Sequence, residues 1–299
     1  MPSDIDSQWK AWNAEHPERR LTRAQFRLER GGKKPTWEDY RKPTFTVSRS
    51  ELGLEPKPLQ RVFLIPDTHV PYHSLDAYSL ALRAREYFKP DHTVILGDFA
   101  DCMAVSFHDK ESERSQDFAW EVEQVNKALD RIVDLGDEKH YVMGNHEVRL
   151  QRYLNQKAPE IFRLLSIEQL FKLQQRGWNV TPYGQSTRLG KLNITHDEGN
   201  AGPLAAAKAR DTFQGNVVIG HNHAMAVCYQ GNAQGSAHVG ASFGWLGDLD
   251  TISYMHRVRA QRWVHGFGIA YLETDTGNVH LQGVPIVDGK VLIEGKLIT

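Results

Sequence analysis

The fold is decided by residues 62–69, which read VFLIPDTH. This stretch begins with four apolar residues, a run typical of a buried strand, and ends in an acid and a histidine, Asp67 and His69. Two later segments have the same form: TVIL precedes GDFAD at 97–101, and YVM precedes GNHE at 144–147. Because sheets of this kind place their chemistry at strand ends, we expect these polar residues to meet at one edge.

Two further apolar runs end in histidines. LNIT at 192–195 precedes His196, and VVI at 217–219 precedes GHNH at 220–223. The five motifs supply carboxylate oxygens and imidazole nitrogens, which suit borderline divalent ions such as zinc, manganese, iron or nickel. Two such ions about 3.5–4 Å apart clamp both the attacking and the leaving oxygen of a phosphoryl displacement. The motifs therefore predict a two-metal hydrolase.

Strands and helices alternate through the first half of this region. Strands at 61–66, 92–96 and 139–143 are separated by helical patterns at 74–88 and 115–135, which favours parallel strands with right-handed crossovers. The predicted fold is α/β, with two mixed sheets packed as a sandwich and flanked by helices. The remaining predicted elements are helices at 147–156 and 159–175, strands at 178–181, 186–195, 216–219, 237–243, 267–273, 278–284 and 290–294, and hairpin turns at 275–278 and 287–290.

Composition permits an ordinary globular enzyme. The 299 residues are 40% hydrophobic, with no apolar stretch of membrane-spanning length and no basic-then-apolar pattern at the start. Two cysteines, Cys102 and Cys228, are too few for a disulfide framework. We therefore expect a cytoplasmic protein with reduced thiols and no membrane partner.

The first 58 residues differ from the rest and end in the proline-punctuated stretch LEPKP. We predict an arm and linker at 1–58 and a catalytic domain at 59–299. Residues 1–61 carry 13 Lys and Arg against 9 Asp and Glu, and Ser7, Thr22 and Thr36 are candidate caps of short aromatic helices. The arm is either a helical nucleic-acid clamp or a solvated extension whose aromatic residues pack on the body.

Between Asp67 and His223 the motifs match in full the pattern DxH, GDxxD, GNH followed by an acid, a single His, and GHxH. In this the chain resembles the calcineurin-like metallophosphoesterase superfamily, and most of all its compact bacterial and phage members. The resemblance implies an αββα sandwich that binds two divalent ions, among Mn, Fe, Zn, Ni and Mg, with manganese the first choice.

Carried over residue by residue, the resemblance implies two ligand sets that share one carboxylate. One ion is held by Asp67, His69, Asp98 and His223, and the other by Asp98, Asn145, His196 and His221. A hydroxide between the ions would attack phosphorus. His146 would assist the leaving group, and Asp101 would orient His146.

Departures from related patterns bear on the substrate. Cys102 and Met103 follow GDFAD where serine/threonine protein phosphatases carry Arg-Gly, and Asp101 stands where double-strand-break nucleases usually carry His. The leading hypothesis is a phosphodiesterase acting on a nucleotide or nucleic acid. The alternatives are a phosphomonoesterase, including a protein phosphatase, and a non-catalytic binding scaffold. Candidate substrate contacts are Arg149, His108, Arg257, Arg259 and Arg262.

Overall fold

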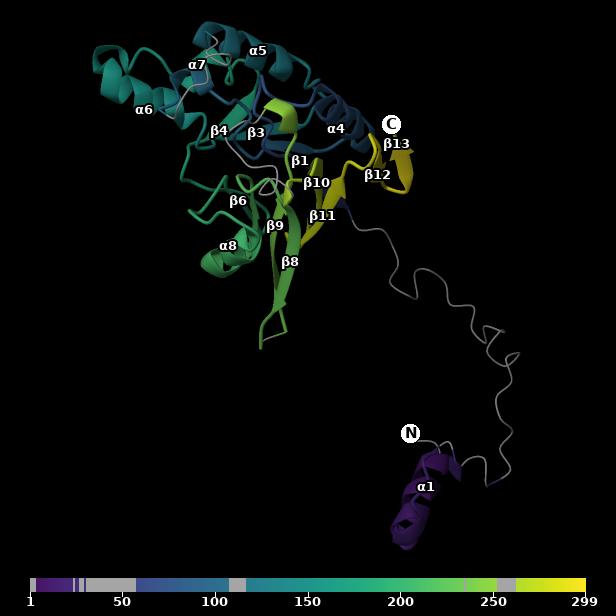
Figure 1. The fold of residues 1–299 in the computed structure, drawn as a ribbon. Helices are drawn as coiled ribbons and strands as arrows, with labels where there is room; N and C mark the ends of the chain where they lie inside the picture. The colour runs from purple at the N-terminus through teal and green to yellow at the C-terminus, as the bar shows by residue number, and fades with distance from the viewer. Residues whose placement is uncertain are drawn as a thin grey trace. The chain divides into compact units, whose positions relative to one another are not determined.

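A computed structural model of the chain describes residues 4–23, 25–26, 30, 58–107, 117–233, 235–251 and 262–299. Residue contacts divide the chain into two units, Met1–Pro56 and Lys57–Thr299 (Figure 1). Among the helices of the described ranges, none has the length and apolar character needed to cross a membrane.

The described part of the first unit is built on helix α1 (Asp4–Glu15) and the 3-10 turn η1 (Pro17–Arg19). Its aromatic side chains pack within the unit: the Trp9 indole donates to the Leu21 carbonyl over 2.9 Å, and Trp12 stacks on His16 with ring centroids 4.4 Å apart. The prediction that Ser7 caps a helix is wrong, because α1 already begins at Asp4 and Ser7 lies inside it.

The predicted cap at Thr22 is confirmed. The Thr22 hydroxyl accepts from the Gln25 backbone N–H over 3.3 Å, and the Gln25 side-chain oxygen accepts from the Thr22 N–H over 2.9 Å. This reciprocal pair is a capping box, and it precedes the buried Phe26. The predicted cap at Thr36 lies outside the described residues.

The second unit contains a six-stranded sheet in the order β11-β10-β1-β2-β3-β4. Strands β1 to β4 are parallel, and β10 pairs antiparallel with both β1 and β11. The predicted alternation of strands and helices is confirmed, with α4 and α5 as the first two crossovers. The bounds are β1 (Leu59–Ile65), α4 (Leu75–Phe88), β2 (His92–Ile95), η2 (Met103–Val105), α5 (Phe118–Asp130), β3 (Glu138–Val142), α6 (Val148–Lys157), β4 (Trp178–Thr181), β10 (Gly266–Glu273) and β11 (Val279–Pro285).

A five-stranded sheet in the order β5-β6-β7-β9-β8 forms the second layer. Strands β6, β7 and β9 are parallel, and β5 and β8 pair antiparallel at its edges. The bounds are β5 (Thr187–Leu189), β6 (Leu192–Ile194), α8 (Ala205–Phe213), β7 (Asn216–Ile219), β8 (Met225–Gly231), β9 (Ala237–Phe243) and η5 (Leu249–Thr251), with a separate hairpin of β12 (Val291–Ile293) and β13 (Lys296–Ile298).

Alternation along β1 separates the two faces of the first sheet. Val62 and Leu64 belong to a buried cluster with Val218 and Phe243 of the second sheet, so they form the core between the sheets. Phe63 and its neighbours on the other face pack against α4 and α5. Helix α8 packs against β7 and β9 on the second sheet (Figure 1). The predicted sandwich is therefore confirmed, and each fully buried Val or Phe contributes about 1.5–3 kcal/mol.

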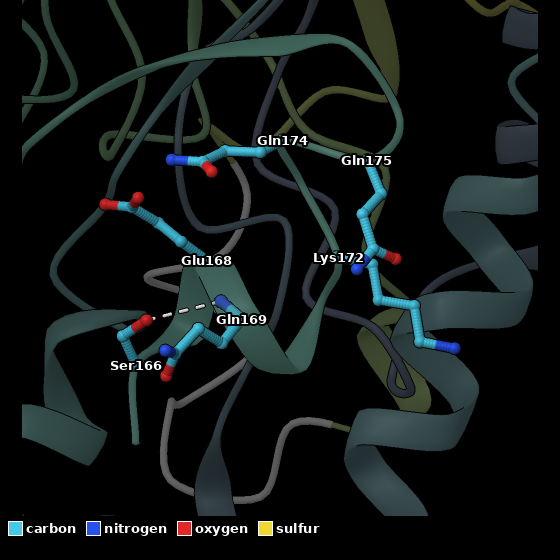
Figure 2. A pocket seen from close by; sticks show the side chains of 6 residues that line it. All are labelled: Ser166, Glu168, Gln169, Lys172, Gln174 and Gln175. Carbon is cyan, nitrogen blue, oxygen red and sulfur yellow. Dashed lines mark hydrogen bonds between the residues drawn. The ribbon is translucent and has the colours of Figure 1, made fainter. Parts of the chain in front are cut away.

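The single helix predicted over 159–175 is wrong. The structure has two short pieces there, η4 (Pro159–Ile161) and α7 (Ile167–Leu170). η4 ends at Ile161, and Ser166 has extended backbone angles and a hydroxyl that accepts from the Gln169 N–H over 3.2 Å, so Ser166 caps the start of α7. Figure 2 shows this contact beside a surface pocket of about 320 Å³, lined by Ser166, Glu168, Gln169, Lys172, Gln174 and Gln175.

The strand predicted over 186–195 is two strands, β5 and β6, joined by a tight turn at Gly190. Gly190 has a φ of 55°, a left-handed conformation that glycine adopts without strain. The elements α8, β8 and β13 were not predicted. The apolar run at the start of β8 was overlooked, and in the structure the strand is half-buried or exposed along its length.

Candidate metal centre

The motif loops from both sheets converge at one edge of the sandwich. The loops after β1, β2 and β3 of the first sheet meet those after β6 and β7 of the second. Hydrogen-bond or ion-pair distances link the seven side chains that the sequence predicts as ligands: Asp67, His69, Asp98, Asn145, His196, His221 and His223.

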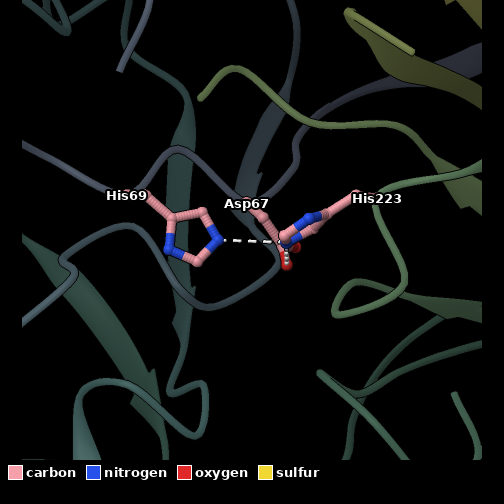
Figure 3. Close-up of side chains that lie close together, drawn as sticks. All are labelled: Asp67, His69 and His223. Atoms are coloured by element: carbon pink, nitrogen blue, oxygen red, sulfur yellow. Dashed lines mark hydrogen bonds and ion pairs between the residues drawn. The ribbon is translucent and has the colours of Figure 1, made fainter. Parts of the chain in front are cut away.

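Asp67, His69 and His223 form one group of converging ligand atoms (Figure 3). The Nε2 atoms of His69 and His223 lie 3.0 Å apart, and His223 Nε2 lies 3.1 Å from Asp67 Oδ2. Asp67 is completely buried, and both of its oxygens accept from the His221 backbone N–H. Two segments more than 150 residues apart in the chain are thereby joined at this group.

Asp98, His196 and His221 form a second group. The side-chain oxygen of Asn145 lies 3.0 Å from both His196 Nε2 and His221 Nδ1, so the amide belongs to this group as well. Asp98 also lies within a third cluster, with His69 and His146. The Asp98 carboxylate therefore stands between the two sets, in the position that a bridging ligand needs.

The donor atoms of His196 fit a cation. Its Nδ1 donates to the Leu96 carbonyl over 2.9 Å, which directs the lone pair of a neutral Nε2 toward Asn145 Oδ1 at 3.0 Å and Asp98 Oδ2 at 3.3 Å. Acceptors facing one another across such distances require a proton or a metal ion. Burial lowers the pKa of His196, but the Asp98 carboxylate outweighs this effect and raises the pKa to about 10, so the site favours a positive charge at Nε2, either a proton or a metal ion. The mixed oxygen and nitrogen set suits a borderline divalent ion.

His146 lies beside the second group but is oriented by Asp101. His146 Nδ1 donates to Asp101 Oδ1 over 2.6 Å, and His69 Nδ1 donates to the same oxygen over 3.1 Å. On its other side, His146 Nε2 accepts from Arg149 Nη2 over 3.0 Å and lies 3.7 Å from Asp98 Oδ2. Asp101 thus contacts both the predicted acid and a predicted ligand.

The backbone of the site is unusual. Among the predicted ligands, His69, Asp98, His221 and His223 all have φ between 46° and 66°, a region that residues other than glycine rarely adopt. Such conformations cluster at functional sites, where the surrounding structure holds them in place. Gly144 is needed for a different reason: a Cβ there would overlap the backbone nitrogen and carboxylate of Asp98.

A family model described as calcineurin-like phosphoesterase matches residues 60–256, which include all seven predicted ligands. The chain belongs to this family. The phosphoesterase is 26% identical to the gene 54 protein of Mycobacterium phage L5 over 259 residues, or 80% of this chain and 98% of that protein.

Two of the similar solved structures share low sequence identity with the phosphoesterase. The Escherichia coli phosphoesterase YfcE is 15% identical, with a TM-score of 0.35, covering 75% of this chain and 99% of its own. A dimetal phosphatase from Danio rerio is 13% identical, with a TM-score of 0.41, covering 76% and 96%. Membership of the family makes the chain a metal-dependent hydrolase of phosphoesters.

Glu147 has a role in the phosphoesterase that the sequence did not reveal. Its buried carboxylate accepts from the backbone N–H groups of Asp98, Ala100 and Gly144 over 2.8–3.1 Å, and from the Tyr141 hydroxyl over 2.8 Å. It therefore ties the GDFAD loop to the GNHE loop. The available signal was its place in the GNHE motif, but no spacing rule indicates which backbone groups a carboxylate will bind.

Two tryptophans hold the His223 ring. Trp245 stacks on it, with ring centroids 5.1 Å apart and an interplanar angle of 13°, and Trp263 meets it edge-on at 4.4 Å. Trp245 is buried, whereas Trp263 is half-buried. An aromatic surface therefore borders one predicted ligand.

The predicted substrate contacts are only partly described. His108, Arg257 and Arg259 lie outside the described residues, and Arg262 is exposed next to Trp263. Arg149 is half-buried and donates to His146 and to the Asp101 carbonyl, over 3.0 and 2.8 Å. Its guanidinium is therefore held at the site, although its predicted contact with substrate phosphate stays a prediction.

Proposed function

We propose that this phosphoesterase hydrolyses a phosphodiester of a nucleotide or nucleic acid, with His146 assisting the departure of the leaving oxygen. The observation that carries the proposal is the placement of His146, whose Nδ1 is held by Asp101 while its Nε2 points toward Asp98. Hydrolysis of a diester breaks one P–O bond and releases an alkoxide, which needs a proton. A histidine held in place is the usual proton donor.

The cations would be held by the two ligand groups that share Asp98. When bound, two divalent ions would supply the positive charge that stabilises the transition state and activates water. Manganese is our first choice among Mn, Fe, Zn, Ni and Mg, because its preference for oxygen suits Asp67, Asp98 and Asn145.

His146 must exchange a partner during the reaction. Its Nε2 accepts from Arg149 in the present arrangement, so a proton on Nε2 requires Arg149 to turn away. A phosphate anion would draw the guanidinium toward itself and release Nε2. Asp101 would keep Nδ1 in place, because the same carboxylate oxygen is also held by the His69 Nδ1–H.

The nucleotide assignment is supported by Trp263. This half-buried indole lies against the ring of His223, and the exposed Arg262 precedes it in sequence. Aromatic faces near basic side chains bind bases by stacking, at about 1–3 kcal/mol per base. A phosphoserine or phosphothreonine side chain of a protein offers no base to such a surface.

Turnover of bis-para-nitrophenyl phosphate and para-nitrophenyl phosphate in manganese tests the function. We expect the diester to be the better substrate, Asp98→Ala to be inactive, and His146→Ala to retain metal while losing about 10²–10⁴-fold in turnover. Preference for the monoester would favour phosphomonoesterase. Equal diester turnover by the wild type, Asp98→Ala and His146→Ala would end the proposal. A wild-type protein that binds no metal and hydrolyses neither substrate would favour a non-catalytic scaffold.

We also propose that residues 1–58 contact a nucleic-acid substrate. Arg20 and Arg23 are exposed in the described part of this arm, and its aromatic residues pack within it, so the contact would be chiefly with phosphates. Deleting residues 1–58 should weaken cleavage of single-stranded nucleic acid, most at low salt, and spare the chromogenic diester. Unchanged cleavage of both substrates would overturn the contact.

A further inference from the structure

Three metal-binding side chains lie together at the opposite edge of the first sheet from the metal centre. His92 begins β2, and Glu138 and His140 lie at the start of β3, whereas Asp98 and Asn145 follow the far ends of these strands. The parallel register places His92 directly beside Glu138, and Glu138 and His140 are two residues apart on one strand. All three side chains therefore lie on one face.

Their ligand atoms form a nearly equilateral triangle. His92 Nδ1 lies 3.4 Å from His140 Nε2 and 3.5 Å from one Glu138 oxygen, and His140 Nε2 lies 3.7 Å from the same oxygen. A point slightly out of the plane of such a triangle is about 2.1 Å from all three atoms, which is the bond length that zinc makes to imidazole and carboxylate. The triangle thus matches one face of a tetrahedral site.

Both imidazoles of the triangle are buried. His92 and His140 are each only 8% exposed, and their ring centroids lie 5.6 Å apart. Burial, together with the neighbouring His92, lowers the pKa of His140, and metal binding needs the neutral form of the imidazole. The Glu138 side chain is 67% exposed, which leaves one side of the triangle open to water.

We propose that His92, Glu138 and His140 bind one zinc-class divalent cation, separate from the metal centre, that clamps the starts of β2 and β3. Two imidazoles and a carboxylate are a common zinc set, and water would complete the tetrahedron. The ladder between β2 and β3 holds the ligands in place before binding. The expected role is structural, because the site lies at the opposite end of the strands from His146.

Zinc content of the full chain tests the site. Metal-stripped protein is equilibrated with a fixed low concentration of free zinc, and bound zinc per chain is measured by elemental analysis. We expect His140→Gln to bind one zinc ion fewer than the wild type. His280→Gln is the matched control, because His280 is an exposed strand histidine that also contacts a glutamate. Equal zinc content in all three proteins would overturn the proposal.

Glu138→Gln is a second variant that should not disturb folding, because the Glu138 side chain is mostly exposed. We expect this variant to fold as the wild type does by circular dichroism. In a zinc titration, we expect its affinity for zinc at the site of His92, Glu138 and His140 to fall at least tenfold. Unchanged affinity in this variant would also contradict the site. His140→Gln should keep its diester turnover in manganese, so the result is independent of the proposed function.

Discussion

The carboxylate of Asp101 accepts from His146 Nδ1 over 2.6 Å, and this contact sets which nitrogen of His146 faces the metal centre. Burial raises the pKa of Asp101, but the charges and hydrogen bonds of His146 and His69 outweigh it and lower the pKa below its usual range. Asp101 therefore stays ionised through neutral pH and holds both rings in one tautomer.

Asp101→Asn should impair both histidines. The amide is neutral, and its oxygen cannot hold two imidazoles as strongly as a carboxylate does. We expect about a 10–100-fold loss in manganese affinity, through His69, and a further loss in kcat at saturating manganese, through His146. Metal titration and diester kinetics measure the two effects separately. Asp117→Asn, at the exposed start of α5, is the control. A change in affinity with normal kcat would contradict the link to His146.

Glu147→Gln should destabilise the site and the fold together. The amide keeps one acceptor oxygen and turns its NH2 group toward backbone N–H donors, so buried donors lose their partner. We expect about 2–4 kcal/mol less stability in urea unfolding, with weaker metal binding. Tyr141→Phe removes only one contact to Glu147 and should cost about 1 kcal/mol. Glu123→Gln, in an exposed ion pair with Lys127, should be nearly neutral. Equal losses of stability in the three variants would rule out the role of Glu147 in joining the two motif loops.

Gly144→Ala tests the close approach of the two motif loops. The added Cβ would overlap the Asp98 backbone and carboxylate, so the shared ligand must move. We expect at least a tenfold loss of metal affinity and a larger loss of diester turnover. The control is Gly215→Ala, where the nearest atom lies 3.6 Å from the added carbon. Wild-type metal affinity in Gly144→Ala would contradict the assignment of Asp98 as a ligand.

Glu121 should make stability depend on pH. Burial raises its pKa from 4.5 to about 7, and the Ala104 N–H, 3.0 Å away, lowers it only in part. The folded protein therefore binds this proton more tightly than the unfolded chain, and the associated stability is lost as pH rises from about 4.5 to 7.

Glu121→Gln stays neutral and should be more stable than the wild type by about 1–3 kcal/mol at pH 8, but not at pH 4.5. Urea unfolding at both pH values measures the difference. Glu123→Gln on the same helix should show no such pH dependence, because Glu123 is exposed. A stability difference that is equal at both pH values would show that the effect of Glu121 is not electrostatic.

The sequence by itself determined the strand ends and the residues that follow them. Each apolar run, such as Val217–Ile219, is local, and a polar residue after a parallel strand lies at the sheet edge whatever the details of packing. Asp98 and His221 could therefore be predicted as site residues, and the βαβαβ order could be predicted from the alternation of patterns.

Only the tertiary structure decided what depends on register and on sheet packing. The 3.0 Å approach of His196 to Asn145 joins residues of different sheets, and the four contacts of Glu147 join two loops. The triangle at His92 exists because β2 and β3 pair in one register, and a shift of one residue would turn these side chains to opposite faces. Such contacts arise between distant parts of the chain, so no local pattern records them.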